Sequence, residues 1–170
     1  MHRESPHAFS SSDSFWRWLS LSLVLVIIDQ VSKLKVAFML PLHDRIELTP
    51  FFNLVHTLNP GAAFSFLANA GGWQRHFFTL LGLLVSFFLI FLLWRGVRSR
   101  LETLAYVFIV AGALGNVVDR LRIGAVIDFL DFHWQGWHWP AFNSADVFIV
   151  MGVGIMVFTS LMRQGHKEDV

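Results

Sequence analysis

The sequence contains no cysteine, which excludes disulfides, thiolate nucleophiles and cysteine-ligated metals. Charge is also scarce, because Asp, Glu, Lys and Arg make up only 15% of the chain and the formal net charge is +1. So weak a field gives nucleic acid no electrostatic reason to bind, and we expect no such partner. Any catalysis must therefore use Asp, Ser, His, Lys or Tyr side chains.

Apolar residues dominate the composition: 55% of the chain is hydrophobic, with 18 Phe and 7 Trp. This composition is typical of a membrane protein. A helix needs about 20 mostly apolar residues to cross a bilayer. Four segments approach this, and they predict an all-α integral membrane protein with transmembrane helices at 15–38, 77–94, 103–118 and 144–162.

The first of these segments is the least apolar, since it contains Asp29 and Lys33 near its end. A cleaved signal peptide is the competing interpretation. No small-x-small cleavage site follows Ile28, so we interpret the segment as a retained helix.

The orientation in the membrane follows from basic residues in short loops. The brief link between the second and third helices carries three arginines, Arg95, Arg98 and Arg100, and is predicted to be cytoplasmic. Both termini then lie in the cytoplasm, with 1–14 as a disordered lead, and the connections 39–76 and 119–143 face outward. Four arginines on that outer side run against the bias: Arg45, Arg75, Arg120 and Arg122.

The first outer connection has strand-like patterns. Residues 45–49 alternate with a period of two, and strand-forming residues at 51–55 precede an Asn-Pro-Gly turn at 59–61 and an apolar run at 62–66. We expect a small β-rich platform here, between the first and second helices. Four tryptophans near predicted outer helix ends are expected to anchor the protein among membrane lipids: Trp73, Trp134, Trp137 and Trp139.

Aspartates gather at one membrane level. Given the predicted helix directions, Asp29, Asp119 and Asp146 all fall at outer helix ends, and Asp128 and Asp131 lie in the connection on that side. A charge at the centre of a spanning helix costs about 2.5 to 3.5 kcal/mol, so such residues usually have a function. Two carboxylates brought close together cannot both ionise easily. One can activate water while its partner polarises a carbonyl, which is aspartic peptidase chemistry.

Each of these groups also has a structural interpretation. Asp29 and Lys33 have the spacing of an ion pair on one helix face. The residues at 116–120 could equally form a polar cluster at a helix end, and Asn143 could simply cap a helix. Asp128 lies in an apolar run without an adjacent cation, so a purely structural role explains it poorly. Sequence spacing alone, however, does not make Asp128 a better catalytic candidate than Asp119.

Other chemistries lack their motifs. There is no HExxH sequence, and His133 and His138 look like interface residues rather than zinc ligands. Neither a GxSxG elbow nor a glycine-rich phosphate loop is present. We therefore expect no metal and no cofactor.

Five motifs resemble those of the bacterial lipoprotein signal peptidases, also called signal peptidase II, over about residues 15–163. They are DQVSK at 29–33, NPGAAF at 59–64, GNVVDR at 115–120, VIDF at 126–129 and FNSAD at 142–146. Each is weak alone, but five in order are specific.

The resemblance implies an aspartic endopeptidase of the bacterial inner membrane, active at the periplasmic face. It would remove signal peptides from diacylglyceryl-modified prolipoproteins by cleaving before the lipidated Cys. It implies Asp128 and Asp146 as the catalytic pair and Asp29 with Lys33 as structural support. Residues that would bind substrate or brace the pair are Asn59, Gly61, Asn116, Asp119, Arg120, Asn143 and Ala145. We expect a monomer.

Two other functions stay open from the residues alone. One is a small proton- or ion-coupled transporter that uses the aspartates as a relay. The other is a non-enzymatic scaffold subunit whose aspartates serve only packing.

Overall fold

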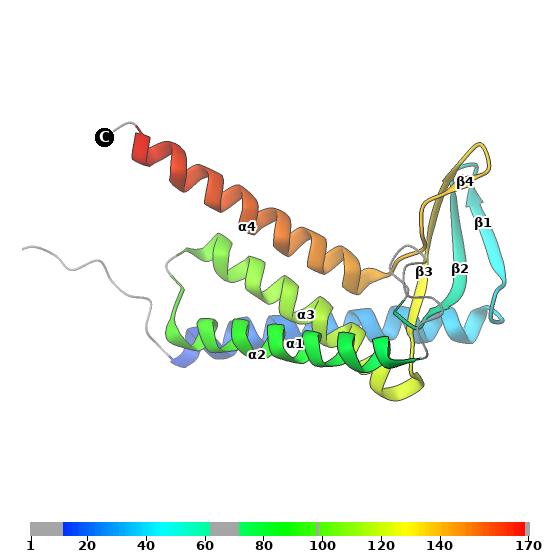
Figure 1. The fold of residues 1–170 in the computed structure, drawn as a ribbon, viewed down its shortest axis with the longest axis horizontal. Helices are drawn as coiled ribbons and strands as arrows, with labels where there is room; N and C mark the ends of the chain where they lie inside the picture. The colour runs from blue at the N-terminus through cyan, green and yellow to red at the C-terminus, as the bar shows by residue number, and fades with distance from the viewer. Residues whose placement is uncertain (1–11, 62–71, 98, 169–170) are drawn as a thin grey trace, which may run out of the picture.

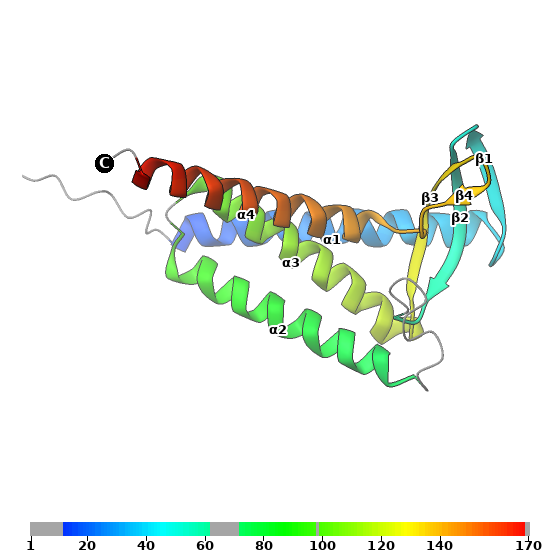
Figure 2. The same ribbon diagram turned by 45° about the horizontal axis from the view of Figure 1, so that its top comes forward.

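The computed structural model describes residues 12–61, 72–97 and 99–168. In this part of the chain a bundle of long helices carries a small sheet across one of its ends (Figures 1 and 2). The helices are α1 (Ser12–Met39), α2 (Trp73–Arg95), α3 (Arg100–Ile123) and α4 (Ser144–Glu168). Each predicted apolar segment lies inside one of them. The start of α1 and the end of α4 lie together at the end opposite the sheet.

Helix α3 forms the centre of the bundle. In its most apolar window 67% of the residues are buried, against 17% for α2 and 11% for α4. Glycines allow α4 to approach it closely. A Cβ at Gly112 would collide with the backbone oxygen of Ala145, and one at Gly152 would lie 2.7 Å from the backbone oxygen of Ala105. Small residues are the usual means of close packing between membrane helices.

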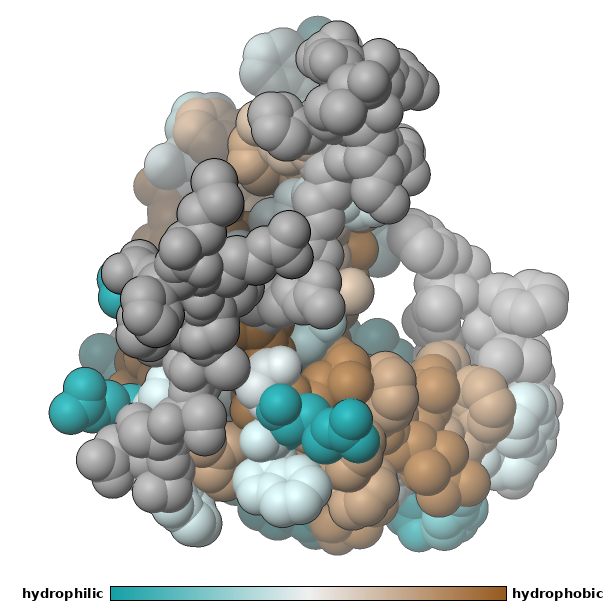
Figure 3. Space-filling model, turned by 90° about the vertical axis from the view of Figure 1, so that its left-hand side faces the viewer, coloured by the Kyte–Doolittle hydropathy of each residue, from teal (hydrophilic) through white to brown (hydrophobic). Residues whose placement is uncertain are grey.

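The outer surface of the bundle is apolar. Among the described residues α2, α3 and the Ser144–Met162 part of α4 are long and apolar enough to cross a membrane. Seen from the end opposite the sheet, hydrophobic residues cover most of the described surface on one side of the bundle (Figure 3). The chain is therefore built to be embedded in a membrane, as its composition predicted.

Helix α1 is not among these three helices, yet much of its surface suits lipid. Many of its apolar side chains point outward, with Leu23, Ile27 and Val31 more than half exposed. Asp29 and Lys33 are completely buried, whereas Arg17 and Lys35, toward the two ends of the helix, are exposed. This inside-out pattern is the reverse of a soluble bundle.

The described strands form one antiparallel sheet in the order β1 (Arg45–Thr49), β2 (Phe52–Asn59), β3 (Val126–Trp134), β4 (Trp137–His138). The predicted platform between the first and second helices is present as β1 and β2, but the prediction was incomplete, because β3 and β4 come from the second connection. Residues 126–129 are all buried, so β3 lacks the alternation that would reveal a strand. Residues 62–66, also assigned to the platform, lie outside the described residues.

The sheet is attached to the carboxyl-terminal end of α1. Val36 of α1 and Leu40, directly after the helix, pack with Phe129 of β3, and His56 Nδ1 of β2 lies 2.9 Å from the backbone oxygen of Leu40. Of the predicted tryptophan anchors, Trp73 begins α2. Trp134 and Trp137, however, flank the β3–β4 turn rather than a helix end. The attachment holds β3 over the end of the bundle, where the aspartates gather.

Candidate active site

Asp128 lies in the middle of the sheet, on β3, where it is paired with Thr57 of β2. Only 3% of its surface is exposed. Both carboxylate oxygens accept hydrogen bonds from asparagine amides, Oδ1 from Asn143 Nδ2 at 2.6 Å and Oδ2 from Asn59 Nδ2 at 3.1 Å. The β2–β3 register thus brings Asn59 to Asp128, although 69 residues separate them in sequence.

The orientation of both amides is fixed by backbone groups. The N–H of Gly61 donates to Asn59 Oδ1 at 2.9 Å, and the N–H of Asp146 donates to Asn143 Oδ1 at 3.1 Å. With their oxygens occupied in this way, both side chains must present N–H groups to Asp128. Gly61 has a φ of +112°, a conformation that favours glycine.

Asp146 lies in the first turn of α4 and is half-buried. Its Oδ2 accepts the backbone N–H of Asn143 at 3.2 Å, while the Asn143 side chain caps the N–H of Asp146. This reciprocal pair is a capping box, and it places Asp146 at the positive end of the helix dipole. The other oxygen, Oδ1, accepts a 2.9 Å hydrogen bond from Asn116 Nδ2.

The two carboxylates therefore share Asn143 as a common partner. Burial, together with the nearby charge of Asp146, raises the pKa of Asp128 to about 6, even though the hydrogen bonds from Asn143 and Asn59 and the charge of Lys33 act to lower it. Asp128 accordingly holds its proton more tightly than an ordinary aspartate does. Such an environment suits a carboxyl group that donates a proton.

Below this pair lies a buried ion cluster centred on Lys33. Its Nζ lies 2.9 Å from Asp29 Oδ2 and 3.0 Å from Asp119 Oδ2, and all three side chains are fully buried. Lys33 Nζ also donates to Asn116 Oδ1 at 2.9 Å. Asn116 therefore connects the cluster to Asp146. The predicted pair of Asp29 and Lys33 is present, but as part of a triad.

Asp119 differs from Asp128 because its charge is compensated. In addition to Lys33 it accepts the backbone N–H of Ile127 at 3.3 Å and contacts Arg122 at 3.5 Å. A carboxylate held in this way is a structural anion between α3 and β3. The geometry thus separates Asp119 from Asp128, which the sequence spacing could not do.

Arg120 lies near the carboxylates without a close ion pair in the described residues. It interacts electrostatically with Asp146, Asp128 and Asp119, and its Cζ lies 5.4 Å from the centre of the Phe78 ring. Its Nε is buried and has no hydrogen-bond partner among the described residues. A free donor beside a carboxylate pair is suited to binding a carbonyl oxygen.

Ala145, another predicted site residue, is fully buried where α4 meets α3. Two residues of the site, Ser144 and Gln30, were not predicted. Ser144 Oγ donates to Asp29 Oδ1 at 2.6 Å, and Gln30 Nε2 donates to both Asp29 and Asp119 at 3.1 Å. Both residues belong to the motifs DQVSK and FNSAD, but Ser144 reaches Asp29 on α1 from α4, and Gln30 reaches Asp119 on α3 from α1. No local pattern could have revealed them.

Asp131 belongs to a separate cluster further along β3. Its carboxylate accepts a 2.8 Å hydrogen bond from Asn53 and contacts His138 Nδ1 at 2.9 Å. Although burial acts to raise the pKa of Asp131, the hydrogen bonds from His138 and Asn53 outweigh it and hold that pKa below its usual value. Asp131 is not part of the pair. The described residues contain no group of His, Asp and Glu suited to hold a metal ion.

A membrane-embedded helical bundle that gathers carboxylates of contrasting environment at one end has the features of a membrane peptidase of the aspartic class. Comparisons with known proteins agree. The sequence profile of the family Signal peptidase (SPase) II matches residues 21–162. This chain therefore belongs to the signal peptidase II family.

Individual relatives support this membership. A lipoprotein signal peptidase of Aeromonas hydrophila is 51% identical over 91% of this chain and 93% of its own length. One from Janthinobacterium is 47% identical over 92% of this chain and 95% of its own length. Among solved structures, one described as a bacterial membrane enzyme superposes with a TM-score of 0.78 at 29% identity, over 89% of this chain and 91% of its own.

Proposed function

We propose that this chain is an aspartic endopeptidase that removes signal peptides from diacylglyceryl-modified prolipoproteins, cleaving before the lipidated Cys. The observation that carries the proposal is the pair of Asp128 and Asp146, linked through Asn143, in which the pKa of Asp128 is raised to about 6. Membership of the signal peptidase II family and the names of the relatives support the choice of substrate.

In the proposed reaction the two aspartates have different roles. Asp128, buried and with the raised pKa, carries the proton, while the more exposed Asp146 is ionised. Asp146 takes a proton from water as the water oxygen attacks the scissile carbonyl carbon, and Asp128 donates its proton to the carbonyl oxygen. The tetrahedral intermediate then collapses: its C–N bond breaks, Asp146 protonates the leaving amine, and Asp128 recovers a proton from the intermediate.

Neighbouring residues hold this arrangement in place. We assign to Asn59 and Asn143 the orientation of Asp128, and to Asn116 the link between Asp146 and the ion cluster of Asp29, Lys33 and Asp119. Arg120, whose Nε has no hydrogen-bond partner among the described residues, would bind a substrate carbonyl. Gly61 and Ala145 keep the backbone compact on either side of the site.

The membrane arrangement is part of the proposal. The four helices cross the bacterial inner membrane, α1 included, because Asp29 and Lys33 are buried inside the bundle while many of its apolar side chains face outward. Both termini lie in the cytoplasm, the connections 39–76 and 119–143 lie in the periplasm, and the protein is a monomer. Each buried CH₂ of a diacylated substrate contributes about 0.8 kcal/mol of anchoring, so its cleavage site stays at membrane level. The aspartate pair lies where such a substrate would present that site.

The test uses purified protein in lipid with a synthetic diacylated prolipoprotein. Asp128→Asn and Asp146→Asn should each abolish turnover while the protein remains folded. Asp131→Asn is the matched control, since Asp131 lies on the same strand with its own partners and should be dispensable for turnover. Full activity in either of the first two variants would refute the assignment of the pair.

The transporter alternative has no support from the family or the relatives. If the protein were only a scaffold, neither the wild type nor any of the three variants would cleave the substrate.

A further inference from the structure

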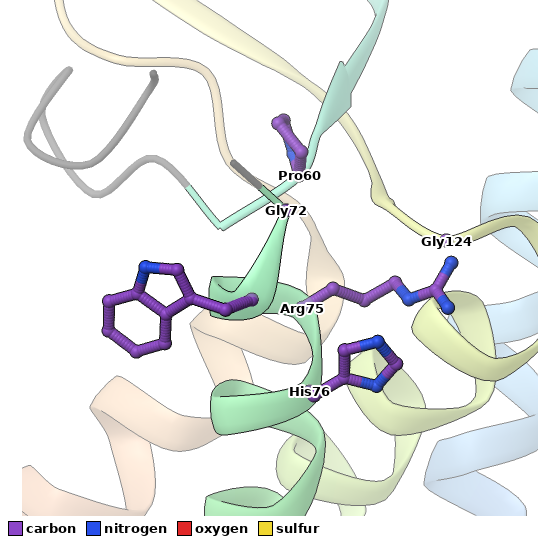
Figure 4. Close-up of a pocket in the computed structure, with 6 residues that line it drawn as sticks. Pro60, Gly72, Arg75, His76 and Gly124 are labelled. Carbon is purple, nitrogen blue, oxygen red and sulfur yellow. The ribbon is translucent and has the colours of Figure 1, made fainter. Parts of the chain in front are cut away.

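An open cavity of about 500 Å³ lies beside the candidate active site, between the first turn of α2 and the turn that follows α3 (Figure 4). Its lining is Pro60, Gly72, Trp73, Arg75, His76 and Gly124. Pro60 directly follows Asn59, but none of the six is a residue of the aspartate pair or its ion cluster. The proposed reaction leaves this cavity without a role.

The cavity is electropositive. Arg75 extends from α2 toward Gly124, and His76 follows it on the helix (Figure 4). Both side chains are exposed, neither has an ion-pair partner among the described residues, and none of the lining residues is acidic. Gly124 leaves room for the Arg75 guanidinium, because a Cβ at position 124 would lie 3.0 Å from Arg75 Nη1. Arg75 is also one of the four arginines that lie on the predicted outer side, whereas basic residues are usually enriched in cytoplasmic loops.

The start of α2 adds hydrogen-bond donors to this charge. Gly72 caps the helix without a side-chain hydrogen bond, and the first turn contains no acidic residue. The backbone N–H groups of the first turn and the positive end of the helix dipole therefore lie beside the Arg75 guanidinium and the His76 imidazole. A guanidinium, an imidazole and the N–H groups of a helix start together match the oxygens of a phosphate.

The position of the cavity specifies where that phosphate comes from. Helix α2 is a candidate membrane span from Trp73 to Arg95, and the cavity lies at its first turn. It therefore lies at the depth of the lipid headgroups, where Trp73 is suited to the interface. Arg75 also lies close to the carboxyl end of α3, whose dipole it can stabilise. That contact places the guanidinium but does not neutralise it, since a helix end carries only about half a charge.

We propose that this cavity binds the phosphate group of an anionic phospholipid, with Arg75 and His76 as the contacting side chains. The recognised chemistry is a phosphate ester, and membrane depth favours a lipid headgroup over a soluble phosphate. The inference is independent of the peptidase assignment, because it concerns other residues and predicts binding rather than turnover.

Lipid retention by the full-length protein in detergent, measured by native mass spectrometry, tests the site. The wild type should retain phosphatidylglycerol more strongly than phosphatidylcholine. Arg75→Gln should weaken phosphatidylglycerol binding by about tenfold, as expected for one lost charge-assisted contact, and Arg75→Lys should restore part of it. The matched control is Arg95→Gln, which removes one charge from the opposite end of the same helix and should leave binding unchanged.

A second arm identifies the source of the phosphate. Inorganic phosphate at millimolar concentration should compete poorly with the lipid; if it displaces phosphatidylglycerol from the wild type, the phosphate chemistry holds but the ligand is soluble. Equal losses in Arg75→Gln and Arg95→Gln would indicate general surface charge and overturn the proposal. Unchanged retention in a folded Arg75→Gln variant, or equal retention of the two lipids by the wild type, would overturn it as well.

Discussion

Asn143 donates a 2.6 Å hydrogen bond to Asp128 from the same side chain whose oxygen caps the backbone N–H of Asp146. One residue thus orients the carboxyl group on β3 and begins the helix that carries the second carboxylate. Because these two roles use different atoms of Asn143, substitution can separate them.

The first prediction separates the two roles of Asn143. Asn143→Ser retains a capping oxygen for α4 but loses the amide donor to Asp128, so activity should fall about 100-fold or more while thermal stability stays near wild type. Asn143→Ala loses both and should also lose about 1 kcal/mol of stability. Turnover of a diacylated substrate and thermal unfolding in detergent measure the two effects. Equal stability losses in both variants would contradict the separation.

The second prediction concerns stability and pH. The pKa of Asp128 is raised from 3.8 to about 6 in the folded protein, so the folded state binds this proton more tightly than the unfolded state does. Its stabilising contribution is fully present below about pH 4 and is lost as the pH rises through about 6, a change of about 3 kcal/mol at most. Unfolding of wild type and Asp128→Asn should be compared from pH 4 to pH 8. The difference between them should shift in favour of the variant as the pH rises, and a pH-independent difference would contradict the raised pKa.

A third prediction tests the buried ion cluster. Lys33→Met leaves Asp29 and Asp119 buried without their cation and should destabilise the protein by about 3 to 5 kcal/mol. Arg45→Ala serves as the control, since Arg45 pairs with Glu47 at 3.2 Å on the exposed sheet and should cost less than about 1 kcal/mol. Denaturant or thermal unfolding in detergent compares the two. Similar losses in both variants would exclude a special role for the cluster.

The fourth prediction concerns the direction of the chain in the membrane. A reporter fused after Val170 should be active in the cytoplasm, and a short tag inserted at Pro50, between β1 and β2, should be accessible from the periplasm. Inversion of both signals would reverse the topology but keep the site at the sheet end. Both positions on the same side of the membrane would contradict an odd number of crossings between them.

Hydropathy was sufficient to find the helices, because each apolar segment is a property of consecutive residues. The strand β3 was missed for the opposite reason: its burial on both faces at residues 126–129 removes the alternation of a half-exposed strand. The pairing of β3 with β2 also joins residues more than 60 positions apart, which no local pattern encodes.

The site itself was predicted in part. The apolar surroundings of Asp128 marked it as unusual, and the motif resemblance named its partner Asp146. Asp119 could not be set apart, because its neutralisation depends on Lys33 from α1 and on the backbone of Ile127. The contact of Ser144 with Asp29 spans 115 residues and likewise exists only in the folded protein.

The order of these elements along the chain has a consequence for synthesis. Asp128 lies on β3, its donors Asn59 and Asn143 come from β2 and the start of α4, and Asp146 belongs to α4, the final helix. A nascent chain that has inserted its first three helices lacks the second carboxylate and one of the two amides that orient the first, that of Asn143. The proposed peptidase would thus acquire its activity only when α4 has entered the membrane, so that chains without α4 cannot cut neighbouring proteins.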